Sequence, residues 1–434
     1  MGELDDALAK IGKADLSPAT GKVKALVGLS IRATLPGLRV GDVVSIERRT
    51  DGPLEAEVVG FDLDDARLMP LGDPSGIGPD DVVRPTGRPL SIRVGNDLLG
   101  RVLDGLGRPV DGGAPLRGEP WSVVRPAPNA LSRRRITRPL PTGVKTIDGL
   151  MTLGEGQRVG LFAGSGVGKS TLLGQIARHA DADVVVTALV GERGREVRAF
   201  LEDQLGGDGL ARSVTVVATS DTPALVRLRS AWVATAIAES FRAEGKRVLL
   251  LMDSVTRVAR AAREVGLAAG EPPARRGFPP SVFGMLPRLL ERAGNDEHGS
   301  ITAVYSVLVE GGDLDEPIAD EVRGILDGHV VLDRKLADRG RWPAIDPLRS
   351  LSRVMERITD DSHREAARSL REDLAVYESK RDLVLLGAYE PGHDERLDRV
   401  LSKLDRIEAF LRQAPNTPHD FDATRSALAR LDGD

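Results

Sequence analysis

The chain has 434 residues, of which 41% are hydrophobic and 29% are charged, so it is long enough for two to three globular domains. Its net charge of −5 gives no bulk basic character for nucleic-acid binding, and the absence of cysteine excludes disulfides, thiolate metal sites and cysteine nucleophiles. The apolar runs are short and strand-like, and the first residues carry no apolar signal-peptide core. We therefore expect a cytoplasmic protein that reaches a membrane only through partners.

The N-terminal part is predicted to be a polar leader followed by a small β-barrel. Residues 1–20 are polar and charged, and β-rich segments separated by Gly, Pro and Asp turns follow over residues 21–88. Barrels that bind oligonucleotides stack the bases on aromatic side chains. Phe61 is the only aromatic residue before Trp121. A structural or assembly barrel is therefore favoured over an RNA-binding one.

Strands and helices alternate from about Val144 to Arg349, which predicts a parallel α/β domain bounded at residues 89–358. A Pro- and Arg-rich segment within residues 90–145 leads into the alternating part. We interpret its arginine cluster as a solvated linker or an intersubunit ion-pair face in preference to an anion site, because isolated charge runs are usually solvated. The cluster comprises Arg133, Arg134, Arg135 and Arg138.

The stretch RVGLFAGSGVGKSTLLGQIA, residues 158–177, predicts a phosphate-binding loop. An apolar strand precedes the glycines and a helical apolar pattern follows them, so backbone N–H groups and the new helix N-terminus can face a phosphate. Lys169 can reach the β- and γ-phosphates, and the Ser170 hydroxyl can hold Mg²⁺. The first position of the pattern is Ala163 instead of Gly. The residues expected to contact a nucleoside triphosphate here are Gly164, Ser165, Gly166, Val167, Gly168, Lys169, Ser170 and Thr171.

Acidic residues follow two later apolar strands. The run Arg247–Met252 leads directly into Asp253, a position that suits a carboxylate holding the Mg²⁺ water, although Asp253 as a helix cap is the competing interpretation. After the strand Val184–Val190, either Glu192 or Glu196 can orient the attacking water, and spacing alone does not choose between them. An ordinary salt bridge from Glu192 to Arg193 or Arg195 is the structural alternative.

The C-terminal part, residues 359–434, is predicted to be helical. One apolar stripe recurs at helical spacing after Ser362, and a stronger one runs from Leu397 to Leu411 before Pro415 ends it. These patterns indicate a bundle-like C-terminal domain.

Together these motifs resemble the type III secretion ATPase family, which includes the flagellar export and injectisome ATPases and is similar to the catalytic subunits of rotary ATP synthases. The resemblance covers nearly the whole chain and rests on six motifs in order: GRVLDGLGRPVDGG, AGSGVGKST, GERGREV, LLLMDSVTR, GEPPARRGFPPSVFGMLPRLLERAG and RWPAIDPLRSLSRVM. It implies a P-loop NTPase (RecA-like) α/β core with an N-terminal β-barrel and a C-terminal helical domain. It also implies a homohexameric ring with its nucleotide sites between subunits.

The resemblance also assigns roles to site residues. Glu192 matches the catalytic glutamate, and Arg193 beside it joins the catalytic set. Arg353 matches the arginine finger that enters the neighbouring subunit's site. Trp342 falls where the ATP-synthase relatives place an adenine-contacting aromatic. Lys169, Ser170 and Asp253 match the phosphate-loop lysine and the two residues that hold Mg²⁺ and its water.

The implied activity is ATP hydrolysis that energises protein export and releases and unfolds chaperone-bound cargo, with ATP and Mg²⁺ as cofactors. The implied partners are a stator-like regulator at the N-terminus, a central coiled-coil stalk near the loop Glu310–Glu316, chaperone–cargo complexes, and the export apparatus at the inner membrane. No nucleic acid is expected. The alternatives are a rotary ATP synthase subunit, a hexameric RNA translocase and a non-catalytic ring. Several motifs look closer to the injectisome branch, and the flagellar branch stays open.

Overall fold

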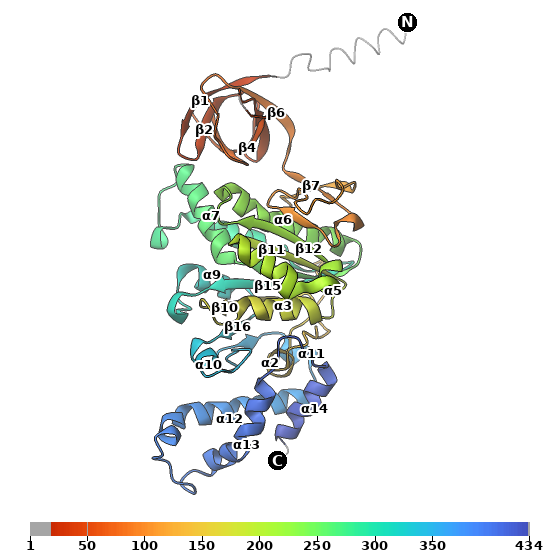
Figure 1. Cartoon of the computed structure of the whole chain (residues 1–434), viewed down its shortest axis with the longest axis vertical. Helices are drawn as coiled ribbons and strands as arrows, with labels where there is room; N and C mark the ends of the chain where they lie inside the picture. Colours follow the sequence, from red (N-terminus) through yellow and green to blue (C-terminus); the bar gives the residue numbers. More distant parts are fainter. Residues whose placement is uncertain (1–18, 50, 433–434) are drawn as a thin grey trace. The chain divides into compact units, whose positions relative to one another are not determined.

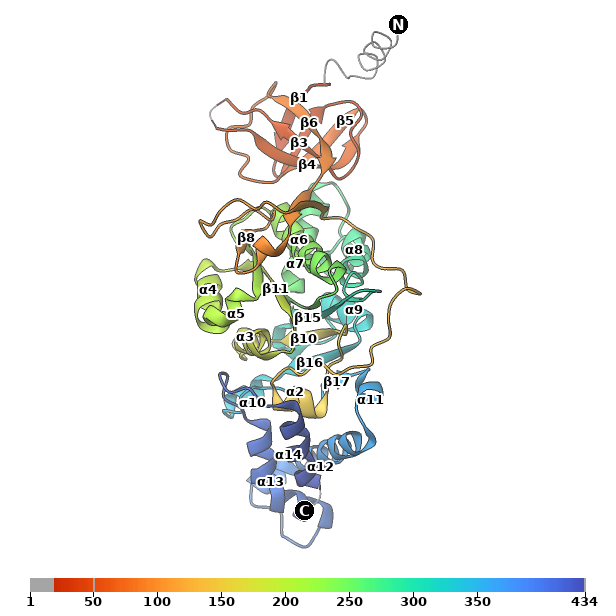
Figure 2. The ribbon, with the colours of Figure 1, turned by 90° about the vertical axis from the view of Figure 1, so that its right-hand side faces the viewer.

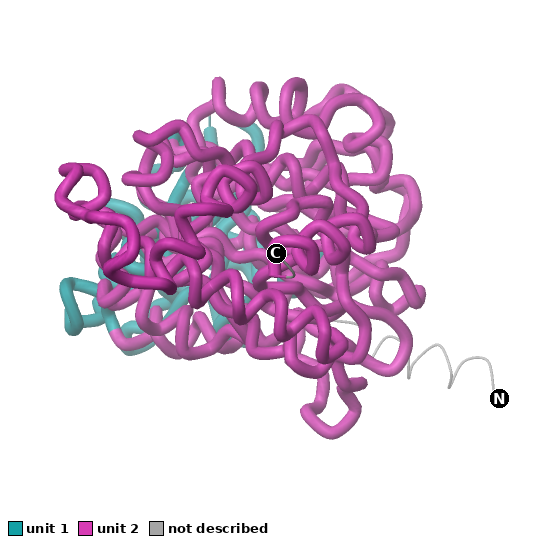
Figure 3. The backbone as a smooth tube through the Cα atoms, turned by 90° about the horizontal axis from the view of Figure 1, so that it is seen from below, with its two compact units in different colours: residues 1–91, 221–226, 261–279 teal, residues 92–220, 227–260, 280–434 magenta. Residues whose placement is uncertain are grey.

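The computed structural model describes residues 19–49 and 51–432, so the polar leader predicted for residues 1–20 lies outside the described residues up to position 18. The described chain forms two compact units. The first comprises residues up to Ser91 with 221–226 and 261–279, and the second comprises 92–220, 227–260 and 280–434 (Figure 3). Each unit is described by itself.

Six strands of the first unit close into a β-barrel, which confirms the predicted N-terminal fold (Figure 1). The sequence VKALVGLSIRATL reads as one β-rich piece, but it folds as a hairpin. Gly28, with φ of 59°, provides the positive φ that such a tight turn needs. The strands are β1 (Gly21–Val27), β2 (Ser30–Thr34), β3 (Asp42–Ile46), β4 (Leu54–Asp62), β5 (Asp65–Pro70) and β6 (Val82–Pro89). Residues that point into the barrel, such as Ile31 on β2 and Leu68 on β5, are fully buried.

A nine-stranded sheet forms the centre of the second unit, within the described residues. Its order is β17-β16-β10-β15-β13-β11-β12-β8, with β14 paired to β15. The pairs from β16 to β8 are parallel, and β14 and β17 are antiparallel additions. The strands are β8 (Val102–Asp104), β10 (Arg158–Ala163), β11 (Val184–Glu192), β12 (Ser213–Thr219), β13 (Arg247–Asp253), β14 (Gly294–Asn295), β15 (Ser300–Leu308), β16 (Gly328–Leu332) and β17 (Leu351–Ser352).

Helices connect the parallel strands, as the alternating pattern predicted (Figure 1). They are α3 (Lys169–His179), α4 (Gly194–Ala199), α5 (Gly206–Ala211), α6 (Ala224–Ala243), α7 (Val255–Ala268), α8 (Pro280–Leu290), α9 (Pro317–Ile325) and α10 (Arg334–Asp338), with a π-helical turn at Phe200–Leu205. Short 3₁₀ turns lie at Asn96–Leu98, Arg275–Gly277 and Glu310–Gly312. No helix in residues 19–49 and 51–432 is both long and apolar enough to cross a membrane.

The segment that leads into the core is more ordered than a solvated linker. Its strand β8 pairs with β12 at the edge of the main sheet, and β7 (Ser91–Val94) pairs with β9 (Glu119–Ser122). Arg133 donates hydrogen bonds to the carbonyls of Ala293 and Glu291, and Arg134 donates to those of Asp296 and Gly299. These two arginines therefore fasten the segment to the core, so the solvated-linker interpretation is wrong for them.

The C-terminal helices pack on one another and on α2 (Lys145–Leu150), below the sheet in Figures 1 and 2. Both predicted apolar stripes face this packing: Leu370 and Leu374 are buried on the first long helix, and Leu397 and Ile407 on the second. An ion pair of 2.5 Å between Lys403 and Asp373 joins the same two helices. The elements are α11 (Met355–Ile358), α12 (Asp361–Leu385), α13 (Glu395–Leu411) and α14 (Phe421–Asp432).

Candidate active site

The phosphate-binding loop lies between β10 and α3, as predicted from the sequence. Helix α3 begins at Lys169, immediately after Gly168, whose φ is 82°. A Cβ at this glycine would lie 2.8 Å from the ring of Trp342, so both its conformation and its surroundings require glycine. Val167 is buried beneath the loop and anchors it to the core, while Ser165 and Ser170 are exposed. The loop therefore offers its backbone and helix N-terminus to an anion.

Lys169 connects the loop to the acidic ends of two neighbouring strands. Its ammonium nitrogen lies 2.5 Å from Oδ1 of Asp253 at the end of β13, and 3.8 Å from Oε1 of Glu192 at the end of β11. Ser306, on the intervening strand β15, donates a hydrogen bond of 2.6 Å to the same Asp253 oxygen. The order β10-β15-β13-β11 thus brings together residues that are far apart in the sequence, at the carboxyl edge where parallel sheets bind ligands.

A β-bulge aims Glu192 at this point. The pairing of β11 with β12 shifts between Val190 and Glu192, and Gly191 between them has φ of 68°. Bulges are used next to active sites to redirect a side chain. The redirected carboxylate is 6% exposed, and its Oε2 lies 3.1 Å from the guanidinium of Arg257, which also donates to the carbonyl of Gly191.

The surroundings of Glu192 make its proton affinity unusual. Burial raises its pKa to about 7, the nearby carboxyls of Glu196 and Asp253 act in the same direction, and Lys169 and Arg257 oppose them. Hydrogen bonding with Glu192 lowers the pKa of Glu196. An acid that titrates near neutrality in a cavity is suited to proton transfer or to orienting water.

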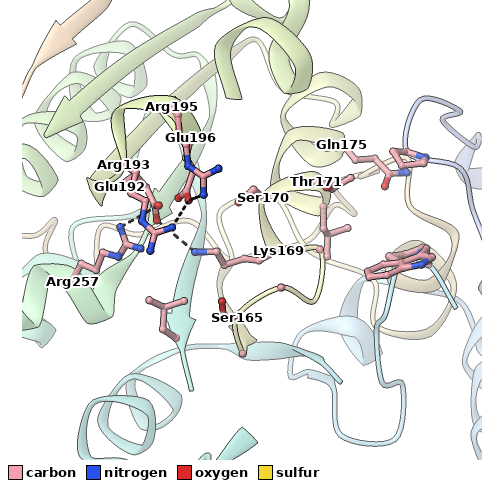
Figure 4. A pocket seen from close by; sticks show the side chains of 18 of the residues that line it. Ser165, Lys169, Ser170, Thr171, Gln175, Glu192, Arg193, Arg195, Glu196 and Arg257 are labelled. Atoms are coloured by element: carbon pink, nitrogen blue, oxygen red, sulfur yellow. Dashed lines mark ion pairs between the residues drawn. The ribbon is translucent and has the colours of Figure 1, made fainter. Parts of the chain in front are cut away.

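The two candidate acids have different partners. Arg193 and Arg195, both largely exposed, lie 3.6 Å from Oε1 of Glu196 and form their ion pairs with that residue. The salt bridges with Arg193 and Arg195 that were considered for Glu192 are therefore made by Glu196. Glu192 faces Lys169 and Arg257 instead (Figure 4).

These residues line a cavity of about 750 Å³ in the second unit (Figure 4). Lys169, Ser170 and Thr171 lie at its centre, with Glu192 and Arg193 at one end. The remaining lining is of another character and includes Trp342, Pro343, Pro415, Gln175 and Gln413. The cavity thus has a charged part beside the phosphate loop and a part with planar, apolar and amide groups.

The donor set suits Mg²⁺ held together with a phosphate. Magnesium is typically bound by one or two carboxylates and substrate phosphate oxygens, in place of an all-protein cage. Ser170 presents an exposed hydroxyl in the first turn of α3, and Asp253 is a buried carboxylate in contact with the preceding residue, Lys169. In the described part of the chain, no group of three His, Cys, Asp or Glu residues is placed to hold a metal. Oε1 of Glu192 is buried without a hydrogen bond, which leaves an acceptor for a water.

Arg353 is the one predicted catalytic residue outside the cavity. It follows β17, its side chain is exposed, and its backbone N–H donates to the carbonyl of Asp327 at 3.0 Å. Sequence reasoning missed Arg257 and Ser306. Arg257 follows the end of β13 by four positions, near the start of α7, so chain order was a usable signal that it lies at the carboxyl edge of the sheet, where its partner is Glu192. Ser306 gave no signal, because it sits within an apolar strand.

Comparison with known proteins decides the family. The model described as "ATP synthase alpha/beta family, nucleotide-binding domain" matches residues 143–352, and the corresponding beta-barrel domain model matches 32–87. The model "T3SS EscN ATPase C-terminal domain" matches 359–430. The flagellum-specific ATP synthase of Bacillus subtilis is 50% identical over 95% of both chains. The type 3 secretion system ATPase of Xanthomonas euvesicatoria is 52% identical over 95% of this chain and 94% of the relative.

The chain belongs to the type III secretion ATPase family. It is an ATPase, as the sequence predicted. The structure of the assembled ATPase EscN from enteropathogenic E. coli matches with a TM-score of 0.90 and 46% identity, covering 95% of this chain and 99% of EscN. EscN in complex with its central stalk EscO matches with a TM-score of 0.88 at the same identity and coverage. The three-part fold predicted from the sequence is therefore confirmed.

Proposed function

We propose that this chain forms a homohexameric ring that hydrolyses ATP to energise type III protein export, releasing and unfolding chaperone-bound cargo. The observation that carries the proposal is the convergence of two carboxylates on Lys169: Glu192, which lines the cavity with Lys169, and the buried Asp253. Hydrolysis needs a positioned water and compensation of the charge on the transferring phosphoryl group. This chain carries a residue for each need: Glu192 to position the water and Lys169 to compensate the charge.

The site residues divide the work between binding and chemistry. On ATP binding, the Lys169 ammonium exchanges its contact with Asp253 for the β- and γ-phosphates, which the backbone of residues 164–171 surrounds. Glu192, fixed by Arg257, orients and polarises the attacking water. Ser170 and Asp253 would hold Mg²⁺ and its water, and the ion would compensate the charge of the phosphates. Arg193, at the cavity wall, adds positive charge beside Glu192.

Arg353 and Trp342 complete the assignment. Arg353 is exposed and outside its own subunit's cavity, which suits an arginine that enters the site of the next subunit in a ring. The related EscN is described as an assembled ATPase, which supports a ring for this chain. Trp342 lines the cavity and is 41% exposed, so its ring is available to stack on adenine.

The partners follow from the same family membership. EscN binds a central stalk, EscO, and we extend a coiled-coil stalk contact to the exposed loop Glu310–Glu316 of this chain. We further propose a stator-like regulator at the N-terminus, chaperone–cargo complexes at the C-terminal helices, and attachment of this cytoplasmic protein to the inner-membrane export apparatus through those partners. Both flagellar and injectisome relatives lie near 50% identity, so neither branch is preferred.

Mixing two inactive variants tests the shared site. Lys169→Ala lacks the phosphate-loop cation but keeps Arg353, and Arg353→Ala has the opposite defect. In a mixed ring, an intact loop from one variant meets an intact Arg353 from the other. We expect each variant alone to lose roughly 10³-fold or more in turnover and the mixture to recover activity. A mixture as inactive as its components, or a fully active Arg353→Ala protein, contradicts the proposal.

The same assay separates the alternatives. A rotary ATP synthase subunit needs a non-identical partner, so ATP turnover by this chain alone in a stable homohexamer argues against that role. An RNA translocase predicts hydrolysis stimulated by RNA. The barrel offers Phe61, 49% exposed, as its single aromatic residue for base stacking, so we expect polyuridylate to leave the rate unchanged.

A further inference from the structure

Gln175 presents a buried amide donor that the phosphate-loop chemistry does not use. It lies on α3, is 2% exposed and lines the cavity, yet its Nε2 makes no hydrogen bond to any described residue. Buried polar groups almost always have a partner, and an exception in a binding cavity needs an explanation. A ligand acceptor that occupies the cavity provides one.

The position of Gln175 points to the base end of a nucleotide. It comes six positions after Lys169 on the same helix, a rise of about 9 Å along the axis. Figure 4 shows its side chain beyond Thr171, on the side of Lys169 away from Glu192. A nucleotide with its γ-phosphate at Lys169 therefore extends its base toward this end. The cavity lining also includes Trp342, Pro343 and Pro415, whose flat apolar surfaces suit a stacked ring, and the carbonyl of Pro415 accepts a hydrogen bond from Arg178, three positions after Gln175 on α3.

The other amide side chain in the cavity lining, that of Gln413, already has hydrogen-bond partners. Gln413 donates from Nε2 to the carbonyls of Gly143 and Thr417, at 2.6 and 2.8 Å, and its Oε1 accepts from the backbone N–H of Lys145 at 2.9 Å. Gln413 is therefore structural, and the donor left available to a ligand belongs to Gln175.

We propose that Gln175 is a base-contacting residue that donates a hydrogen bond from Nε2 to a ring nitrogen of adenine. Adenine presents N1 and N7 as acceptors beside its amino group, and glutamine is well suited to such an edge. The inference rests on the proposed function in taking ATP as the ligand. It adds a polar contact to the stacking expected of Trp342.

The variant Gln175→Met tests this contact, because it keeps the side-chain volume and removes the amide. We expect ATP affinity, measured by calorimetry with Mg²⁺, to fall about three- to tenfold, the size of one lost hydrogen bond. Affinity for inorganic tripolyphosphate, which has no base, should not change. The melting temperature of the nucleotide-free variant should be equal or higher, because an unpartnered buried amide has been removed.

Adenine analogues identify the acceptor and separate a base contact from a ribose contact. In the parent protein, either 7-deaza-ATP or 1-deaza-ATP should bind more weakly than ATP by the same factor, and the Gln175→Met variant should not discriminate between that analogue and ATP. The inference is overturned if the parent protein binds both analogues as tightly as ATP. It is also overturned if Gln175→Met loses ATP and tripolyphosphate affinity in parallel, or if its melting temperature is lower than that of the parent protein. Failure of the parent protein to bind ATP refutes the proposed function itself, which keeps the two outcomes distinct.

Discussion

The guanidinium of Arg257 lies 3.1 Å from Oε2 of Glu192 and also bonds to the backbone carbonyl of Gly191, so one arginine fixes both the carboxylate and the bulge that aims it. Arg257 is carried by α7, directly after the strand that ends in Asp253. The acid proposed to orient water and the acid proposed to hold the metal water are therefore positioned by consecutive parts of the chain. This arrangement makes the following predictions.

Glu192→Gln should bind ATP normally and lose turnover. The amide keeps the shape of the side chain, and it can neither accept the proton of the attacking water nor polarise it as a carboxylate does. General-base catalysis contributes about 10²–10⁴-fold, which sets the expected loss in kcat. Nucleotide affinity measured by calorimetry serves as the control. Near-normal hydrolysis by the variant contradicts the assignment, and Glu196→Gln is the matched variant that should retain most activity.

Glu192→Gln should also alter how the free energy of unfolding depends on pH. Glu192 titrates near 7 in the folded protein, against an ordinary value of 4.5. Below pH 4.5 the carboxyl is neutral in both states, and as the pH rises toward 7 the unfolded state ionises first, so the native state loses stability. Relative to the parent protein, Glu192→Gln should gain up to about 3 kcal/mol between these pH values, since each pKa unit corresponds to about 1.36 kcal/mol. Denaturant melts at pH 5 and 8 without nucleotide measure this gain, and a difference that is the same at both pH values counts against it.

Arg257→Gln should reduce kcat and move the pH profile. The arginine lowers the pKa of Glu192, so its removal raises that pKa above about 7. Because the ionised carboxylate is the active form, the rising limb of kcat/KM against pH should shift to higher pH. Arg257→Lys should return part of the shift. ATP titrates in the same way with the parent protein, Arg257→Gln and Arg257→Lys, so it does not contribute to a difference between them. If the rising limb of kcat/KM is at the same pH in Arg257→Gln as in the parent protein, the arginine does not act on Glu192.

Gly191→Ala should lower both stability and turnover. Gly191 has φ of 68°, and an added Cβ would lie 2.9 Å from Cδ of Arg257. The left-handed conformation costs a non-glycine residue about 1–2 kcal/mol, and relief of the contact displaces Arg257 from Glu192. Chemical denaturation and steady-state rates measure the two effects. Gly207→Ala is the matched control, because Gly207 is exposed on α5 with no atom within 4 Å of the new Cβ.

ATP binding should change the fluorescence of Trp342. The other two tryptophans lie outside the cavity lining, so they are expected to report little. Stacking on a base is worth about 1–3 kcal/mol, so Trp342→Ala should weaken ATP binding by roughly fivefold or more. Trp342→Phe should keep most of the affinity and lose the optical signal. A signal that persists in Trp342→Phe would remove the adenine contact from the assignment.

Much of the architecture was predictable because it depends on local patterns. An apolar strand, a glycine loop and a helix define the phosphate site between β10 and α3. The acid that ends β13 could be placed at the carboxyl edge from chain order alone. The helical stripes around Leu370 and Ile407 face the packing as their spacing indicated.

What escaped prediction depends on pairing between distant segments. The short strand β8, flanked by glycines, gave no strand signal of its own and is defined by its pairing with β12. The redirection of Glu192 depends on a register shift that only the partner strand reveals. In the sequence, Gln175 is one polar residue in an apolar helical pattern. Only the three-dimensional structure shows that its buried Nε2 has no hydrogen-bond partner. The use of Arg133 to bind carbonyls of a segment about 160 positions away was equally invisible.

Gln413, in the segment after α13, makes three of the contacts that hold this segment to the core. The backbone N–H of Gln413 donates to the carbonyl of Trp342 at 2.9 Å. Its side chain accepts from the backbone N–H of Lys145, at the start of α2, and donates to the carbonyl of Gly143 just before that helix. Gln413 and Pro415 line the nucleotide cavity, so the C-terminal part proposed to meet cargo contributes to that lining. A load that pulls on the C-terminal helices should therefore reach the cavity lining through this segment, which would couple mechanical force to nucleotide release.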